Sequence, residues 1–363
     1  MKNVFVAATR QNDGKTMVSL GLFNSFQKRF SNVAYIKPVG QQYKIINEKK
    51  IDKDAVLMHS IYHLQDDLSD MSPIAVPRGF TSSYINKGNL DHLIERIKVS
   101  YDSLSRGRDF VLIEGTGHAG VGSVFDMSNA DVASLLKSKV IMVSLGGIGR
   151  PIDEILLNKA VFDRKGVELL GVIVNKVAPQ KYDKINEMVR KGLARHNIRT
   201  FGVIPLVDML SKPSVAELVE DLDAEFLSGN EEMMTNTIRK FVIGDMQPHA
   251  AVDVFSNNTL LILPGNRDGL IVTALIGDLL ESSDVQNMAA MVFTEGIRPP
   301  YKIMDLVRRS GIPTMLVKED SFSVATKINN SIFKLRKEET EKIKTSQELV
   351  EEYVDVDEIC RLL

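Results

Sequence analysis

The stretch VFVAATRQNDGKTMVSLGLF, residues 4–23, passes from an apolar segment through Gly-Lys-Thr into a pattern typical of a helix. A strand, a loop and a helix in this order can hold a phosphate group, because N–H groups of the loop and of the helix start point toward it. Gly14, Lys15 and Thr16 supply the glycine, the cation and the hydroxyl of such a loop, although Thr9 stands where the usual spacing has a first glycine. A helix that begins with Gly-Lys-Thr by chance is the alternative. We predict a phosphate-binding loop, since most of its donors are backbone groups.

Apolar runs of strand length recur along the first two hundred residues, with helical patterns between them. The expected strands are 4–8, 33–39, 110–115, 140–147, 169–177 and 200–205. The expected helices are 15–30, 89–106, 126–137, 151–165 and 182–197. Strands that are apolar throughout and alternate with helices predict an α/β fold, a parallel sheet with helices on both faces. Ligands of such sheets bind at the carboxyl ends of the strands.

The pattern changes after Pro205, where a Lys-Pro break precedes an acidic helical stretch. Strand-like runs then return at 259–277, 288–296 and 312–320, each ending in glycine or acidic residues. We therefore predict two domains, residues 1–211 and a smaller α/β domain over residues 212–363. The second includes a C-terminal helical segment whose charged run KLRKEETEKIK is typical of a solvated helix face.

The composition narrows the class of protein. The 363 residues include 45 basic and 47 acidic side chains, a net charge of −2, so no overall charge favours binding to nucleic acid or to an anionic membrane. No apolar run reaches the roughly 20 residues of a membrane span, and the start lacks a signal-peptide pattern, so we expect a cytoplasmic protein. The single cysteine, Cys360, excludes a disulfide within the chain.

Several motifs follow one another in a characteristic order. They are Ala8 through Thr16, Lys37-Pro38-Val39, Asp54-Ala55, Glu114-Gly115-Thr116-Gly117 and Asn175-Lys176-Val177. In this order they resemble the dethiobiotin synthetase family, which is related to the amidotransferases that make cobyrinic acid diamide. The resemblance covers roughly residues 1–210. The remainder resembles the DRTGG domain, and the same pairing occurs in the N-terminal part of long phosphate acetyltransferases.

The resemblance implies ATP and Mg²⁺ as cofactors. Nucleotide contacts then fall on the loop and helix start, on two later glycines and on two strand ends: Asn12, Asp13, Gly14, Lys15, Thr16, Met17, Gly115, Gly117, Asn175 and Pro205. Lys15 would neutralise charge on the β- and γ-phosphates, and Asn175 and the backbone after Pro205 would meet the adenine. An asparagine at the end of a strand is equally typical of a plain turn.

Metal and catalytic roles follow from the same resemblance. Thr16, Asp54 and Glu114 would ligate Mg²⁺, which favours hard oxygen ligands. Lys15, Lys37 and Glu114 are the expected catalytic residues, with Lys37 near the γ-phosphate and the substrate. The alternatives are a helix-cap carboxylate for Asp54 and a surface lysine for Lys37.

One further motif suggests a different ligand. Residues 115–120 spell G-x-G-x-x-G after a strand, the pattern of a dinucleotide site. The motif follows the third expected strand instead of the first, and no acid ends a strand about 20 residues later, so we expect no dinucleotide there. His118 is a candidate donor or a simple loop histidine. Arg150, in a glycine-rich turn, could contact an anion or simply precede the helix that Pro151 opens.

Departures from the resembled families leave two functions open. Gly40-Gln41-Gln42-Tyr43 replaces the Ser/Thr-rich loop of dethiobiotin synthetases, which argues against biotin chemistry. Cys360 lacks the context of a glutaminase nucleophile. The first function is an ATP-dependent enzyme, ligase-like, synthetase-like or an ATPase, acting on a small carboxylate. The second is an ATP-binding regulatory protein that senses a small ligand through the DRTGG-like domain.

The second domain offers its own candidate site. Residues 265–269 and 294–296 follow apolar runs and so are expected at the carboxyl ends of strands, with Arg267 available to a phosphate or carboxylate. A plain turn with Arg267 paired to Asp268 is the alternative. The expected partners are thus a nucleotide and a small anionic ligand or substrate, without nucleic acid or membrane, and the candidate assembly is a homodimer.

Overall fold

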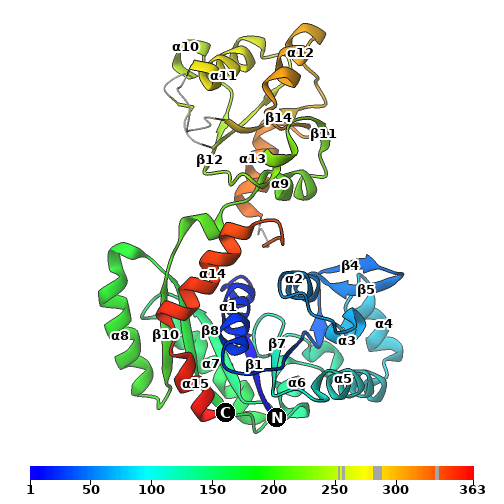
Figure 1. The fold of residues 1–363 in the computed structure, drawn as a ribbon, viewed down its shortest axis with the longest axis vertical. Coiled ribbons are helices and arrows are strands. Elements are labelled where there is room, and N and C mark those ends of the chain that lie inside the picture. Colours follow the sequence, from blue (N-terminus) through cyan, green and yellow to red (C-terminus); the bar gives the residue numbers. More distant parts are fainter. Residues whose placement is uncertain (252–253, 256–257, 281–287, 332–334) are drawn as a thin grey trace. The chain divides into compact units, whose positions relative to one another are not determined.

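The structure is a computed structural model that describes residues 1–251, 254–255, 258–280, 288–331 and 335–363 (Figure 1). It divides the chain into two compact units. The first consists of residues 1–207 together with 335–363, and the second of residues 208–334. Each unit is described by itself.

A six-stranded sheet forms the centre of the first unit, in the order β10-β9-β8-β1-β7-β2. All of its pairings are parallel. The strands are β1 Lys2–Ala8, β2 Val33–Ile36, β7 Phe110–Glu114, β8 Val140–Leu145, β9 Leu169–Val177 and β10 Thr200–Pro205. Their side chains are almost all buried, because helices cover the sheet, and the predicted parallel α/β sheet is confirmed.

Five helices follow strands of the sheet in the expected alternation: α1 Lys15–Gln27, α5 Leu90–Ser105, α6 Asn129–Leu135, α7 Arg150–Arg164 and α8 Tyr182–Ala194. The C-terminal helices α14 Thr340–Tyr353 and α15 Val356–Leu362 also belong to this unit. On α1, Phe23 and Phe26 are fully buried, and their rings contact Tyr35 and Phe110 of the sheet. This packing fixes the helix that begins at Lys15 over the strands beside it.

The connection from β2 to β7 contains small elements that the sequence analysis did not assign. They are β3 Val39–Gly40, β4 Tyr43–Ile46, β5 Lys49–Asp52, α2 Lys53–Ile61, α3 Leu68–Met71, β6 Ile74–Ala75 and α4 Phe80–Lys87. Strands β4 and β5 form an antiparallel hairpin, and α2 follows it directly. Asp52 caps α2 by accepting a hydrogen bond from the Asp54 backbone N–H at 2.9 Å.

The C-terminal helices belong to the first unit, whereas the sequence analysis assigned them to the second domain. Helix α14 lies beside α1 (Figure 1), so closely that a Cβ on Gly21 would collide with Val350. Ser25 Oγ donates to Glu351 Oε2 at 2.6 Å, and the Asp355 N–H donates to the Phe201 carbonyl at 2.9 Å. The charged residues at the start of α14 suggested a solvated helix. The apolar residues of α14, however, are buried, and Val350 among them packs against α1.

Val350→Ala is expected to destabilise the first unit by about 2 kcal/mol, because it leaves a cavity where a fully buried side chain meets Gly21. Thermal unfolding followed by circular dichroism measures the effect. Glu348→Ala, an exposed change on the same helix, is the control and should stay within about 0.5 kcal/mol. Equal effects of the two changes would contradict the packing of α14 on α1.

The second unit has a five-stranded sheet in the order β11-β15-β14-β13-β12, parallel except for the edge strand β11. The elements are α9 Val215–Asp221, β11 Glu225–Ser228, β12 Lys240–Ile243, α10 Pro248–Ala251, β13 Thr259–Pro264, α11 Asp268–Leu280, β14 Met288–Thr294, α12 Tyr301–Ser310, β15 Thr314–Leu316 and α13 Ser321–Asn330. Leu260 and Ile262 enter one apolar cluster, while Leu261 and Leu263 enter another. Since side chains alternate along a strand, the sheet is covered on both faces. The predicted smaller α/β domain is confirmed in this respect.

None of the helices in the described ranges combines the length with the apolar character that crossing a bilayer requires.

Candidate functional site

The loop between β1 and α1 has the shape of a phosphate-binding loop with a single glycine. Asn12 and Gly14 both adopt left-handed backbone conformations, with φ of 71° and 91°. Asparagine tolerates this region better than most residues, so it can stand where a glycine is usual. At Gly14 a side chain is excluded as well, because a Cβ there would collide with the Asn175 amide. The loop therefore keeps its curvature with one glycine.

Asp13 points into the protein and shapes the loop. Its Oδ2 accepts hydrogen bonds from Thr9 Oγ1 at 2.6 Å and from the Arg10 N–H at 2.8 Å. Its Oδ1 is buried and has no hydrogen-bond partner among the described residues. Burial raises the pKa of Asp13, and the bond from Thr9 lowers it in part. The hydroxyl of Thr9 thus has a structural use at the position where a glycine was missing.

The end of β9 braces the same loop. Asn175 Nδ2 donates to the Asp13 carbonyl at 2.9 Å, and Lys176 Nζ donates to the Asn12 carbonyl at 2.8 Å. Asn175 Oδ1 accepts from the Lys176 N–H at 2.9 Å, so both ends of this buried amide are occupied by protein. The expected contact of Asn175 with adenine stays a prediction. Burial lowers the pKa of Lys176, although the charge of Asp13 opposes the change.

Four side chains converge on Glu114, the last residue of β7. Its carboxylate is fully buried and accepts from Thr16 Oγ1 at 3.2 Å and from Lys37 Nζ at 3.1 Å, both at Oε1. Lys15 Nζ lies 3.7 Å from the same oxygen, and Tyr35 Oη donates to Oε2 at 3.0 Å. The structure therefore brings together the three residues expected to be catalytic, Lys15, Lys37 and Glu114.

Lys37 is the buried centre of a charge network. Its Nζ pairs with Asp54 and lies 3.7 Å from Asp52 Oδ1, and only 3% of the residue is exposed. Burial of the ammonium lowers its pKa, but the charges of Asp52, Asp54 and Glu114 together raise the pKa well above the usual lysine value. Lys37 thus stays protonated, and the alternative of a surface lysine is wrong. Asp52 caps α2, so Asp54 is not the cap residue.

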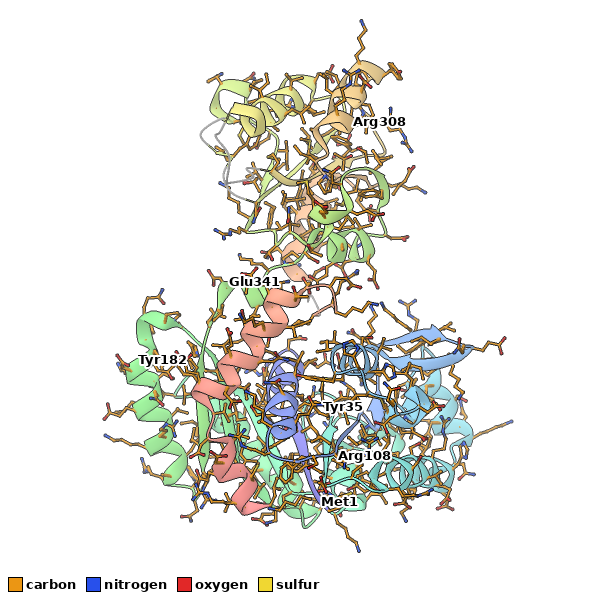
Figure 2. All side chains as sticks on the ribbon, viewed as in Figure 1. Met1, Tyr35, Arg108, Tyr182, Arg308 and Glu341 are labelled. Atoms are coloured by element: carbon orange, nitrogen blue, oxygen red, sulfur yellow. The ribbon has the colours of Figure 1, made fainter. Side chains whose placement is uncertain are left out.

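Tyr35, Asp52 and Lys176 were missed by the sequence analysis. Tyr35 lies inside the first unit, where Figure 2 labels it, and it is fully buried. Burial, followed by the charge of Glu114, raises the pKa of its phenol well above the usual value, so Tyr35 remains a donor. Asp52 had a recognisable signal, because it stands two residues before a helix-starting acid. Tyr35 and Lys176 had none, since an apolar strand and a strand end contain such residues routinely.

The glycine loop after β7 lies against the phosphate-binding loop. The Ala8 N–H donates to the Gly117 carbonyl at 3.2 Å, and Gly117 has a positive φ of 64°. A Cβ on Gly115 would press on the ring of Phe5, so this close approach requires glycine. Asn129 holds the loop by donating to the Thr116 and His118 carbonyls at 2.8 and 2.7 Å. These glycines serve close packing beside the loop.

The oxygen atoms at this site suit a magnesium ion in part. Thr16 Oγ1 and Glu114 Oε1 lie 3.2 Å apart, near the roughly 3 Å separation of neighbouring ligands in an octahedron with 2.0–2.1 Å bonds. Asp54 is paired with Lys37 instead. Across the described ranges, no group of three or more His, Cys, Asp and Glu side chains is arranged to hold a metal ion. Mg²⁺ in proteins usually keeps several water ligands and is often also coordinated by phosphate oxygens. Two protein oxygens are therefore enough for the protein's share of the coordination.

Other predicted residues lie around this centre. Met17 is buried in the first turn of α1, and Pro205 ends β10, where the Leu206 N–H donates to the Val177 carbonyl at 2.8 Å. Arg150 is exposed and donates to Glu154 Oε1 at 2.9 Å. His118 is exposed, and its Nδ1 accepts from the Gly120 N–H at 3.2 Å.

In the second unit, the two predicted turns are neighbours. Strands β13 and β14 pair in parallel and end together at Pro264 and Thr294. A Cβ on Gly265 would collide with the Ile297 carbonyl, so the turns approach closely. Arg267 is exposed and reaches the Met246 carbonyl at 3.4 Å. A ligand at these turns stays a prediction.

Two protein-family models match the chain, and the boundary between them lies close to the boundary between the two structural units. Residues 2–214 match the model of an AAA domain, and residues 217–331 match the model of the DRTGG domain. The expected resemblance of the second part to the DRTGG domain is thereby confirmed.

Curated relatives match either nearly the whole chain or little more than half of it. Phosphate acetyltransferase from Nitratidesulfovibrio vulgaris is 26% identical over 367 residues, covering 98% of this chain and 51% of the relative. The ATP-dependent dethiobiotin synthetase of Methanocaldococcus jannaschii is 28% identical over 210 residues, covering 55% of this chain and 92% of the relative. The chain spans about half the length of the phosphate acetyltransferases that it matches.

Among solved structures, the septum site-determining protein MinD from Pyrococcus horikoshii with Mg-ADP aligns at 17% identity and a TM-score of 0.36, covering 58% of this chain and 83% of that one. The CBS and DRTGG domains of the Clostridium perfringens pyrophosphatase align at 17% identity and a TM-score of 0.29, covering 43% of this chain and 73% of that one.

Proposed function

The chain belongs to the AAA domain family over residues 2–214, and from this premise we propose that its first unit binds Mg-ATP and uses it for phosphoryl transfer or ligation on a small carboxylate. One observation carries the proposal. Lys15, Thr16 and Lys37 meet at the buried carboxylate of Glu114, at the strand end beside the curved loop. Ligands of parallel α/β sheets bind at such strand ends.

The proposed roles follow from charge and position. Loop N–H groups and Lys15 bind the phosphates, and Thr16 with Glu114 would hold Mg²⁺. When bound, the ion supplies positive charge that draws electron density from the phosphate oxygens. Because its pKa is raised well above the usual value, Lys37 acts as a fixed positive charge near the transferred group and not as a base.

Release of ADP in the presence of small carboxylic acids tests this function. A panel of mono- and dicarboxylates is added to the whole chain with Mg-ATP, and ADP is measured over time. Stimulation by one member and its loss in Lys37→Met supports the enzyme, provided that the variant remains folded. ATP binding without stimulation by any member would contradict turnover on a carboxylate.

That second outcome would favour the other candidate function, an ATP-binding regulatory protein. The match of residues 217–331 to the DRTGG domain is the observation that supports it. In this case nucleotide binding in one unit and ligand binding in the other would be coupled, typically by about 1–3 kcal/mol, and the coupling would be reciprocal.

Lys176→Ala is expected to weaken ATP binding about fivefold to tenfold. The change removes a charged donor from the Asn12 carbonyl and so loosens the loop that would hold the phosphates. Fluorescence titration with a labelled ATP analogue measures the affinity. Lys181→Ala, an exposed lysine a few residues further on, is the control. Unchanged affinity in Lys176→Ala would show that this brace has no role in binding.

A further inference from the structure

A separate cavity lies in the first unit between the end of α2 and the start of α14. Its volume is about 810 Å³, within the range of small-molecule sites. One wall is lined by residues 59–61 and 63–65, and the other by Lys337, Thr340, Ile343, Lys344 and Gln347. None of the residues assigned to Mg-ATP lines it, so it is distinct from the site described above.

The polar lining of this cavity carries basic and neutral groups. His59, His63, Lys337 and Lys344 contribute nitrogen atoms, and none of the lining residues that the structure describes is acidic. Lys344 lies 3.7 Å from Glu348, and Lys337 lies 3.9 Å from Glu338, in pairs whose lysine side chains are more than half exposed. Exposed pairs of this kind contribute little energy, so both lysines can turn to an anion at small cost.

The two imidazoles are open to a ligand. Neither ring has a hydrogen-bond partner among the described residues, although His59 and His63 both offer their backbone carbonyls to neighbours. Leu64 and Ile343 add an apolar surface, and Gln347 adds an amide. Organic anions need these three features, namely cations for the charge, an apolar contact for the body and neutral polar groups for orientation.

We propose that this cavity binds a small organic anion that carries phosphate or carboxylate groups. The imidazoles and lysines contact its charged groups, and the apolar residues contact its body. Binding here does not depend on the function proposed for the phosphate-binding loop, because the two sites share no residue.

The cavity is nevertheless joined to that loop through the helices. Tyr62 Oη donates to the Leu20 carbonyl of α1 at 2.6 Å and accepts from Gln347 Nε2 of α14 at 3.1 Å. Helix α2 also carries Asp54 at its start, where it contacts Lys37. An anion that shifts α2 therefore acts on the helix that carries Asp54, and one that shifts α14 acts on a helix packed against α1. This places the cavity well for regulation of that site.

Histidine NMR of the whole chain tests the proposal, because the protein has six histidines and two of them line the cavity. The probes are inorganic pyrophosphate and citrate, added separately to protein labelled at histidine Cε1. We expect saturable shifts of the His59 and His63 resonances with at least one probe. Pyrophosphate alone would assign a phosphate ligand, and citrate alone a carboxylate. The resonance of His118 reports binding at the phosphate-binding loop independently, and His92 and His196 serve as internal references.

Matched variants decide whether the shifts come from a built site. The double change Lys337→Gln and Lys344→Gln should lower the affinity for the probe, measured from the saturable shifts, at least tenfold. Lys184→Gln, a change of an exposed lysine on α8, should leave the affinity unchanged. Circular dichroism checks that both proteins are folded. The absence of shifts with either probe, or equal affinity in the double variant and the control, would overturn the proposal.

Discussion

Replacing Lys37 by methionine is expected to destabilise the first unit by about 3–5 kcal/mol. The change keeps most of the side-chain volume but removes the ammonium that contacts Asp54 and Glu114 and lies 3.7 Å from Asp52. Breaking a buried ion pair on one side leaves uncompensated charge, and this is among the most destabilising single changes. Urea unfolding of the whole chain, followed by circular dichroism, measures the loss.

The raised pKa of Lys37 also determines how its contribution to stability depends on pH. Because the folded-state pKa of Lys37 is raised well above the usual value, its stabilisation is fully present at neutral pH and is lost only as the pH rises through that higher value. The deficit of Lys37→Met should therefore be complete near pH 7. Lys184→Met, on the exposed side of α8, is the control, with an expected change within about 0.5 kcal/mol. A loss below about 1 kcal/mol in Lys37→Met would contradict the buried network.

Lys15→Ala is expected to reduce the affinity for Mg-ATP about 100-fold, which corresponds to about 2.7 kcal/mol. The Lys15 ammonium lies at the start of α1, 3.7 Å from Glu114, where it would face the phosphates. At ATP concentrations near 100 times the dissociation constant, binding stabilises the unchanged protein by roughly 2.7 kcal/mol, and the variant should lose most of that gain.

Thermal unfolding with and without Mg-ATP measures this effect. Lys28→Ala, just beyond the other end of α1, removes a lysine that is more than half exposed and pairs with Glu351 at 3.2 Å. This control should keep the full response to Mg-ATP. A response in Lys15→Ala equal to that of the unchanged protein would show that the loop does not bind the phosphates.

The sheet of the first unit could be predicted from the sequence because its strands are continuously apolar and alternate with helices. The sequence was also sufficient for the phosphate-binding loop, since strand, loop and helix are adjacent in the chain. Asp54 and Glu114 could be named through the family resemblance, and the structure places Asp54 in α2 and Glu114 at the end of β7. The structure adds that Lys37 lies between them.

The remaining features depend on contacts between distant residues. In the sequence, nothing distinguishes Tyr35 from the other residues of its apolar strand. Its role is seen only in the structure, where its hydroxyl contacts Glu114. Lys176 has a positive φ of 57° near the end of β9 and contacts the Asn12 carbonyl of the loop, and no local sequence pattern predicts this contact. The assignment of α14 failed for a related reason. Its charged beginning is local, whereas the packing of Val350 on Gly21 joins residues more than three hundred positions apart.

Calorimetric titration of the whole chain with ATP, in the presence and absence of Mg²⁺, is the decisive test of Mg-ATP binding by the first unit. We expect saturable binding of one ATP per chain that is tighter with Mg²⁺, and its loss in Lys15→Ala. Glu114→Gln should retain binding without the metal and lose the gain that Mg²⁺ provides, since Glu114 would supply one of the two protein oxygens proposed for the ion. Heats of the unchanged protein that equal those of Lys15→Ala, with and without Mg²⁺, would show that the loop between β1 and α1 does not bind ATP.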